Sequence, residues 1–102
     1  MTTYPAIRDP NRCPSHPGAV LADMLQDLDI TKADVAKLLS ISRQHLHDIL
    51  AERKPVSPTV AARLAKAFGG GIAVWLHLQA DYDAWHAERE IDTSDIPTYR
   101  AA

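Results

Sequence analysis

The 102-residue chain lacks several features that mark whole classes of protein. Its one cysteine, Cys13, excludes a disulfide within the chain. No apolar run approaches the roughly 20 residues that a membrane-spanning helix needs, so we expect no membrane partner. The N-terminal residues show no basic segment followed by an apolar one, which argues against secretion. Together these absences predict a small, single-domain protein of the cytoplasm.

An excess of basic charge is also absent, because the formal net charge is −2. The charges are nevertheless distributed unevenly along the sequence. Residues 31–68 contain seven lysines and arginines against three acids, whereas residues 69–95 contain six acids and one arginine. This asymmetry indicates two surfaces with different partners; the alternative is a chance scatter of surface charge in a small protein.

No segment shows the strict alternation of a half-buried strand, whereas apolar residues recur at helical spacing in five places. Thr31, Ser42 and Ser57 are suited to cap three helices, and Pro58 suits a first helical turn. The glycines at 69–71 are expected to end the fourth helix. The sequence thus predicts an all-α fold with five helices, over about residues 18–28, 32–39, 43–51, 58–68 and 72–90.

The order of these segments predicts three parts of the chain. Residues 1–16 contain Pro5, Pro10 and Pro14 and are expected to form an extended arm. The helical domain covers residues 17–90, and a loose tail covers residues 91–102. The core of the first four helices is predicted to contain Val20, Leu21, Met24, Leu25, Leu28, Val35, Leu38, Leu39, Leu46, Ile49, Leu50, Val60, Ala61, Leu64, Ala65 and Phe68.

Two of the predicted helices, at 32–39 and 43–51, are joined by a very short turn. This arrangement is typical of a helix-turn-helix motif, in which the second helix enters the major groove of DNA. Ala36 is small at a point where two such helices have to cross closely, and Ile41 is placed to fill the turn. A generic helical hairpin needs no small residue at that position.

The second helix of this pair has a polar face that the core does not use. With Leu46 directed inward and about 100° per residue, Gln44, His47 and Asp48 point outward, and Arg43 lies in the first turn. Arginine pairs well with guanine and glutamine with adenine, so Arg43, Gln44 and His47 are the candidates for base reading. The alternative is a polar face that only contacts solvent. Phosphates are expected to bind the amide groups at the starts of both helices, together with Lys32, Ser42, His45, Arg53 and Lys54.

Four short motifs give the sequence a resemblance to a known family. In order, they are His16-Pro17-Gly18, Ser42-Arg43-Gln44, Arg63-Leu64-Ala65-Lys66, and Trp75-Leu76 followed by Leu78-Gln79. Over about residues 15–86 the chain resembles the HigA-type antitoxins of the lambda-repressor-like helix-turn-helix superfamily. The resemblance implies a homodimer that binds double-stranded operator DNA and represses its own operon. It also implies a small, basic, mRNA-cleaving toxin as partner, and base contacts from the same Arg43, Gln44 and His47.

The chain departs from the family pattern at three turns. Family members often have glycine where Ser40 stands, and a serine in a left-handed turn costs on the order of 1 kcal/mol. They often have Asn-Gly where Ala51 and Glu52 stand, so Glu52 places an acid near a loop expected to contact phosphate. Gly70 and Gly71 replace the usual polar cap of the last helix, whose start is expected to fray.

No constellation of residues predicts catalysis or a metal centre. Cys13 and His16 have C-x-x-H spacing, but no second pair completes a tetrahedral set. His45 and His47 are two residues apart on a helix and therefore diverge. Cys13 lies in the proline-rich arm without the orienting third group that nucleophilic catalysis needs. We therefore expect no enzyme activity, no cofactor and no metal.

A stripe of large side chains along the last helix has two interpretations. Trp75, Leu78, Tyr82 and Trp85 recur at steps of three and four residues. They belong either to the core or to a two-fold dimer interface, since a helix of about 19 residues offers more apolar surface than four short helices cover. Two other functions stay open: a stand-alone helix-turn-helix repressor without a toxin, and a protein-interaction module.

Overall fold

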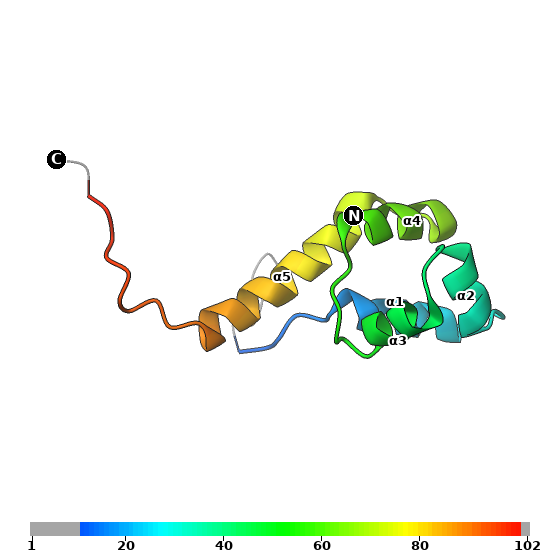
Figure 1. Ribbon diagram of the computed structural model, residues 1–102, viewed down its shortest axis with the longest axis horizontal. Helices are drawn as coiled ribbons and strands as arrows, with labels where there is room; N and C mark the ends of the chain where they lie inside the picture. Colours follow the sequence, from blue (N-terminus) through cyan, green and yellow to red (C-terminus); the bar gives the residue numbers. More distant parts are fainter. Residues whose placement is uncertain (1–10, 101–102) are drawn as a thin grey trace, which may run out of the picture.

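The computed structural model describes residues 11–100, which form five α-helices and no strand (Figure 1). The all-α prediction is therefore confirmed. Residues 1–10 of the predicted arm and residues 101–102 of the predicted tail lie outside the described residues. No helix between residues 11 and 100 is long and apolar enough to cross a membrane. The helices are α1 (Pro17–Gln26), α2 (Lys32–Leu38), α3 (Arg43–Leu50), α4 (Pro58–Phe68) and α5 (Ile72–Glu90).

Polar side chains cap three of the helices at the predicted positions. The hydroxyls of Thr31, Ser42 and Ser57 each accept a hydrogen bond from the backbone N–H three residues later, at 3.1, 2.9 and 3.2 Å. α5 begins after Gly71, which, as expected, offers no side-chain cap. The starts of α2, α3 and α4 are therefore set by the local sequence.

α1 is capped by a histidine, and the residues of this cap pack against α3. His16 is buried, and its Nδ1 accepts a hydrogen bond from the Gly18 N–H at 2.8 Å. Gly18 is also buried, against the last turn of α3. A Cβ on Gly18 would lie 1.8 Å from the carbonyl oxygen of Ile49, so only glycine permits this approach. The His-Pro-Gly motif thus positions α3 through its contact with α1.

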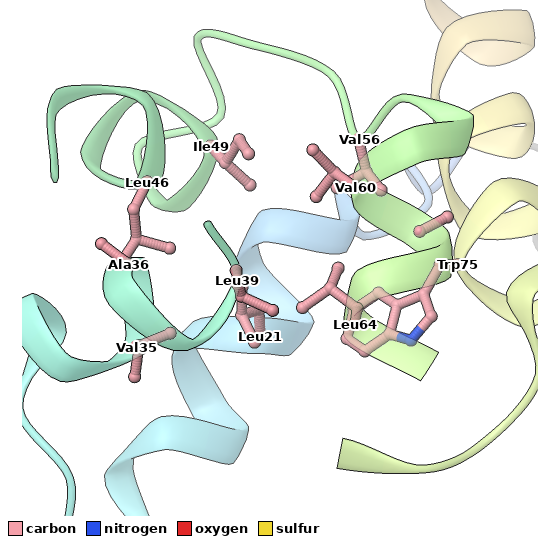
Figure 2. Packing of buried hydrophobic residues seen from close by; sticks show 11 residues of the cluster. Leu21, Val35, Ala36, Leu39, Leu46, Ile49, Val56, Val60, Leu64 and Trp75 are labelled. Carbon is pink, nitrogen blue, oxygen red and sulfur yellow. The ribbon is translucent and has the colours of Figure 1, made fainter. Parts of the chain in front are cut away.

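The core lies where α1, α2 and α3 meet α4 and the start of α5 (Figure 2). Most of the predicted core residues are buried or pack against the buried cluster. Two predictions were wrong, because Leu28 and Leu38 are 43% and 53% exposed. α1 ends at Gln26, so Leu28 lies beyond the helix. The buried stripe of α2 runs through Val35 and Leu39, and Leu38 lies to one side of it.

α5 supplies Trp75 to this core, where Figure 2 shows it next to Leu64. Trp75 is therefore a core residue and is not available to a dimer partner. Leu78, Tyr82 and Trp85 are half-buried. The N-terminal end of the stripe thus belongs to the core, whereas its C-terminal end stays a candidate for a dimer interface.

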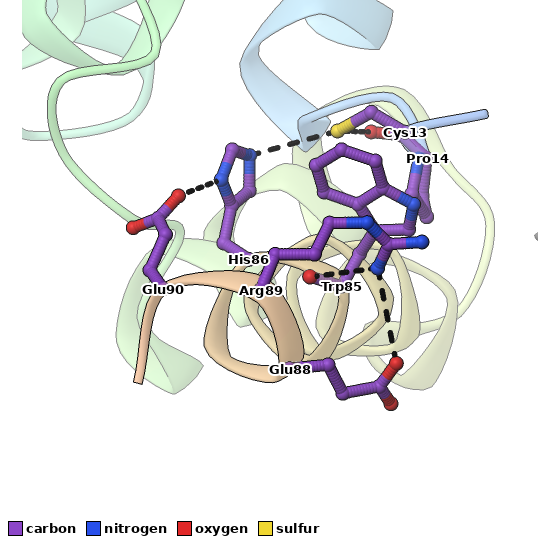
Figure 3. Close-up of polar contacts among 7 residues, drawn as sticks. All are labelled: Cys13, Pro14, Trp85, His86, Glu88, Arg89 and Glu90. Carbon is purple, nitrogen blue, oxygen red and sulfur yellow. Dashed lines mark hydrogen bonds and ion pairs between the residues drawn. The ribbon is translucent and has the colours of Figure 1, made fainter. Parts of the chain in front are cut away.

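The C-terminal half of α5 is partly covered by the residues that precede α1, which run beside it in Figure 1. The ring of His16 packs edge-on against Tyr82, with the ring centroids 4.8 Å apart. Sγ of Cys13 lies 3.6 Å from Nε2 of His86, whose Nδ1 lies 2.6 Å from a carboxylate oxygen of Glu90 (Figure 3). Contacts within the chain therefore use part of the face that was a candidate for dimerisation.

His16 makes the stability of the fold depend on pH. Burial lowers the pKa of His16 below its ordinary value of 6.5, and the carboxylates of Glu52 and Asp83 oppose this only in part. The neutral ring is also the form whose Nδ1 accepts the Gly18 N–H. His16 therefore binds a proton more readily in the unfolded chain than in the folded one. The stabilisation that the buried neutral ring gives to the fold is complete above pH 6.5. It is lost as the pH falls through the lower folded-state pKa.

We expect the free energy of unfolding to decrease between about pH 7.5 and about pH 5, and to decrease less in a His16→Asn variant. Asparagine keeps a capping acceptor but does not titrate. Urea unfolding at several pH values measures this slope, and His77→Asn, on the exposed side of α5, is the control. Equal slopes in the wild type and His16→Asn would exclude His16 as the titrating group.

Candidate nucleic-acid interface

α2 and α3 are joined by a turn that depends on one left-handed residue. Ser40 has a φ of +55°, so the conformation expected of this serine is confirmed. Its N–H bonds the Lys37 carbonyl at 3.1 Å, and the Ile41 N–H bonds the Ala36 carbonyl at 3.0 Å. This pair of bonds is the Schellman ending of a helix. Arg63 of α4 donates to the Ser40 carbonyl at 3.2 Å and so holds the turn from a third helix.

The exposed face of α3 carries the three residues predicted to read bases. Arg43 and Gln44 occupy the first turn and His47 the next, and all three are exposed. Leu46 and Ile49 are buried and pack the helix against α1 and α2. α3 thus presents its N-terminal polar residues outward, as a recognition helix does.

α3 ends in a second left-handed turn, which leads into the predicted phosphate-contacting loop. Glu52 has a φ of +65°, a conformation that favours glycine over glutamate. The N–H groups of Arg53 and Lys54 both donate to the Asp48 carbonyl, at 2.8 and 3.2 Å. The turn therefore places two cations directly beside the last turn of α3.

The carboxylate of Asp48 contacts three of the side chains that were predicted to bind DNA. Its Oδ1 accepts from Nε2 of Gln44 at 3.0 Å and from Nη2 of Arg53 at 3.2 Å, and Oδ2 lies 3.8 Å from Nζ of Lys54. The Asp48 side chain is only 14% exposed, whereas those of Arg53 and Lys54 are 60% and 53% exposed. Desolvation opposes the ionisation of Asp48, but the hydrogen bonds and charges of its partners hold its pKa below the ordinary value. Asp48 is therefore ionised at neutral pH.

The remaining predicted phosphate contacts lie at the starts of α2 and α3. Lys32 is the first residue of α2 and is exposed. Ser42 is exposed, but its Oγ already accepts the capping bond, which leaves its O–H as the group for a phosphate. His45 is half-buried and is the least accessible of these candidates.

Two residues that position this surface were missed by the sequence analysis. Asp48 was noted only as an outward-facing residue, although a Gln44–Asp48 spacing of four residues is a recognisable helical pair. Gln79 of α5 is buried, and its Oε1 accepts the Val56 N–H at 2.8 Å. Gln79 thereby fixes the far end of the loop that follows α3. Because 23 residues separate Gln79 from Val56, no local pattern indicates their bond.

The histidines and the cysteine that the sequence offered as possible metal ligands lie at separate places in the fold. Within residues 11–100, no group of three or more histidine, cysteine or acidic side chains is placed to hold a metal ion. His16 is a buried helix cap, and Cys13 contacts His86 on α5. His45 is half-buried and His47 is exposed, because the two residues lie on different sides of α3.

Comparison with known proteins identifies the helix-turn-helix unit and its relatives. Residues 21–75, slightly more than half of the chain, match the helix-turn-helix family. The Escherichia coli protein YbaQ, described as an uncharacterised HTH-type transcriptional regulator, is 30% identical over 90 residues. The match covers 87% of this chain and 80% of YbaQ.

Two similar solved structures are antitoxins. An addiction-module antidote protein of the HigA family from Coxiella burnetii has a TM-score of 0.76 and 33% identity, over 87% of this chain and all of that one. The Pseudomonas aeruginosa antitoxin HigA, solved with the higBA promoter, has a TM-score of 0.71 and 30% identity, over 83% of this chain and 96% of that one. Sequence, fold and relatives agree, and the chain belongs to the lambda-repressor-like (Xre) helix-turn-helix family.

Proposed function

We propose that the chain is an antitoxin that binds operator DNA as a homodimer, represses its own operon and neutralises a cognate mRNA-cleaving toxin of the HigB type in the cytoplasm. The observation that best supports DNA as the partner is the exposed N-terminal face of α3, with Arg43 and Gln44 in its first turn. These side chains match the major-groove edges of guanine and adenine. The P. aeruginosa antitoxin that was solved with its promoter supports the same partner for this chain.

We propose a homodimer because one such domain offers too few base contacts to bind DNA tightly alone. Two copies on an inverted repeat place their α3 helices in successive major grooves, about 34 Å apart. Ile91, Ile96 and Tyr99 follow α5 and are exposed. The segment after α5 extends away from the helices in Figure 1. We assign these residues, with the Trp85 end of α5, to the contact with the second copy.

Footprinting on the DNA upstream of the gene tests the dimer. We expect two protected half-sites one helical turn apart, about 34 Å, and a dimer in light scattering at micromolar concentration. A monomer that protects one half-site would contradict this part of the proposal.

The second candidate is a stand-alone repressor without a toxin, and the similarity to the regulator YbaQ favours it. Co-purification with the product of the adjacent gene separates the two candidates, because the antitoxin is expected to bring down a small basic protein. A protein-interaction module is a third possibility, which salt-dependent binding to DNA from the chain's own promoter would exclude.

The acidic C-terminal region is the surface that we assign to the toxin. Residues 69–95 contain six acids and one arginine, and Glu88 and Glu90 are exposed at the end of α5. A toxin that cleaves mRNA holds a polyanion and is therefore expected to be basic. Opposite charges on the two proteins would accelerate their encounter. The alternative is that these acids only keep the helix surface solvated.

Neutralising the acids of α5 is expected to slow toxin association about three- to tenfold at low salt. DNA affinity should stay equal or increase, because a negative charge is removed. Stopped-flow mixing at low and high salt measures the rate for a variant with Asn or Gln at Asp81, Asp83, Glu88 and Glu90. The control removes four acids from the opposite part of the chain: Asp23, Asp27, Asp29 and Asp34. An unchanged rate in the α5 variant would place the toxin on another surface, such as α1 or the arm.

A further inference from the structure

The Asp48 cluster, which consists of Asp48, Gln44, Arg53 and Lys54, joins residues with two different tasks. Gln44 is a base-reading candidate on α3, whereas Arg53 and Lys54 are phosphate-contacting candidates in the following loop. All three meet one carboxylate, at 3.0, 3.2 and 3.8 Å. Asp48 itself has no favourable contact to make with a polyanion, so its presence on this surface needs another explanation.

We propose that Asp48 is a positioning residue that determines the sequence specificity of DNA binding. It orients the amide of Gln44 toward the base edges and restrains the two cations of the loop. This inference rests on the proposed function, in which α3 reads operator DNA. Asp48 acts through its partners and does not itself contact a base.

The contact with Asp48 leaves the groups of Gln44 that can pair with adenine available. The amide has two N–H donors and one carbonyl acceptor. Asp48 accepts one N–H at 3.0 Å, which fixes the nitrogen side of the amide toward the helix. The carbonyl oxygen and the second N–H remain available, and these are the groups that a glutamine uses at N6 and N7 of adenine. A side chain that is already ordered also loses less conformational freedom on binding.

The backbone makes the coupling between α3 and the loop rigid. The Asp48 carbonyl accepts the N–H groups of Arg53 and Lys54 at 2.8 and 3.2 Å, while the Asp48 carboxylate holds their side chains. The left-handed Glu52 allows the chain to turn this sharply. One residue thus fixes the base-reading helix and the phosphate-contacting loop relative to each other.

The charge of Asp48 has a separate effect, on binding to DNA of any sequence. Its carboxylate offsets part of the positive charge of Arg53 and Lys54. Without it, both cations are free to follow phosphates, which strengthens sequence-independent binding. Loss of Asp48 should therefore tighten binding to random DNA and reduce discrimination, whereas a folding defect would weaken binding to all DNA.

Two substitutions at Asp48 separate these effects. The probes are a duplex selected from a randomised library by the wild-type protein and a scrambled duplex of equal length. For Asp48→Ala we expect about three- to tenfold tighter binding to the scrambled duplex, and a selected-to-scrambled affinity ratio at least about tenfold lower. For Asp48→Asn we expect the same gain on scrambled DNA but a smaller loss of discrimination, because the Asn oxygen still accepts the Gln44 N–H.

Asp34→Asn is the matched control, because it removes the same charge from α2 outside the Asp48 cluster, and it should keep the affinity ratio of the wild type. Urea unfolding verifies that each variant is folded. An Asp48→Ala protein that discriminates as the wild type does would overturn the role of Asp48. If Asp48→Ala does not fold, Asp48→Asn decides, and unchanged affinity for the scrambled duplex overturns the inference. A wild-type protein that selects no sequence contradicts the proposed function itself.

Discussion

A Gly18→Ala variant is expected to lose about 3 kcal/mol or more of its free energy of unfolding. The added Cβ would lie 1.8 Å from the carbonyl oxygen of Ile49 and 2.8 Å from the carbonyl carbon. Both are backbone atoms of α3, so no change of rotamer relieves the clash. The helices would have to separate, which also disturbs the His16 cap at 2.8 Å from the Gly18 N–H.

Gly71→Ser is the control for this substitution. A Cβ on Gly71 meets no atom nearer than 3.9 Å, and the serine hydroxyl offers α5 the cap that it lacks. We expect a neutral effect or a stabilisation of up to about 1 kcal/mol. Urea unfolding at one protein concentration compares the variants, because the proposed dimerisation would make apparent stability depend on concentration. A loss below about 1 kcal/mol for Gly18→Ala would contradict the close packing of α1 on α3.

Arg43→Ala and Gln44→Ala should each weaken operator binding by about 1–3 kcal/mol, or roughly 5- to 150-fold. Both side chains are exposed on the first turn of α3, so their loss should leave the core unchanged. Each variant should also relax the preference for one base pair, since the proposed contact of that side chain with a base edge is removed. Fluorescence-anisotropy titrations with the operator and its single-base variants measure both effects.

Lys54→Ala is the contrasting variant for these titrations. A lysine that contacts phosphate carries no base information, so we expect weaker binding to all sequences alike and a salt dependence reduced by about one charge. Unchanged affinity and unchanged base preference in both α3 variants would mean that another surface contacts DNA.

Local patterns were sufficient to predict the five helices and most of their starts. A capping hydroxyl bonds an N–H only three residues away, so Thr31, Ser42 and Ser57 could be identified from their place in the sequence. The end of α1 was placed too late, because Leu28 continues the apolar spacing past the point where the helix stops. Periodicity shows which residues share a face but does not encode where the chain leaves the helix.

The candidate site was predicted as a set of residues, but its internal contacts were not. The outward direction of Gln44 follows from the inward direction of Leu46 on the same helix. Arg53 reaches the Asp48 carboxylate across a left-handed Glu52, a conformation that a glutamate does not indicate and that only the glycine of similar family members at this position suggests. The base contacts themselves stay predictions.

The central claim is that α3 reads a specific DNA sequence, and one equilibrium titration tests it most directly. The wild-type protein is titrated at about 150 mM salt with the duplex upstream of its gene and with a scrambled duplex of the same length and composition. We expect at least about a thousandfold higher affinity for the upstream duplex. Two binding curves that coincide would contradict the claim.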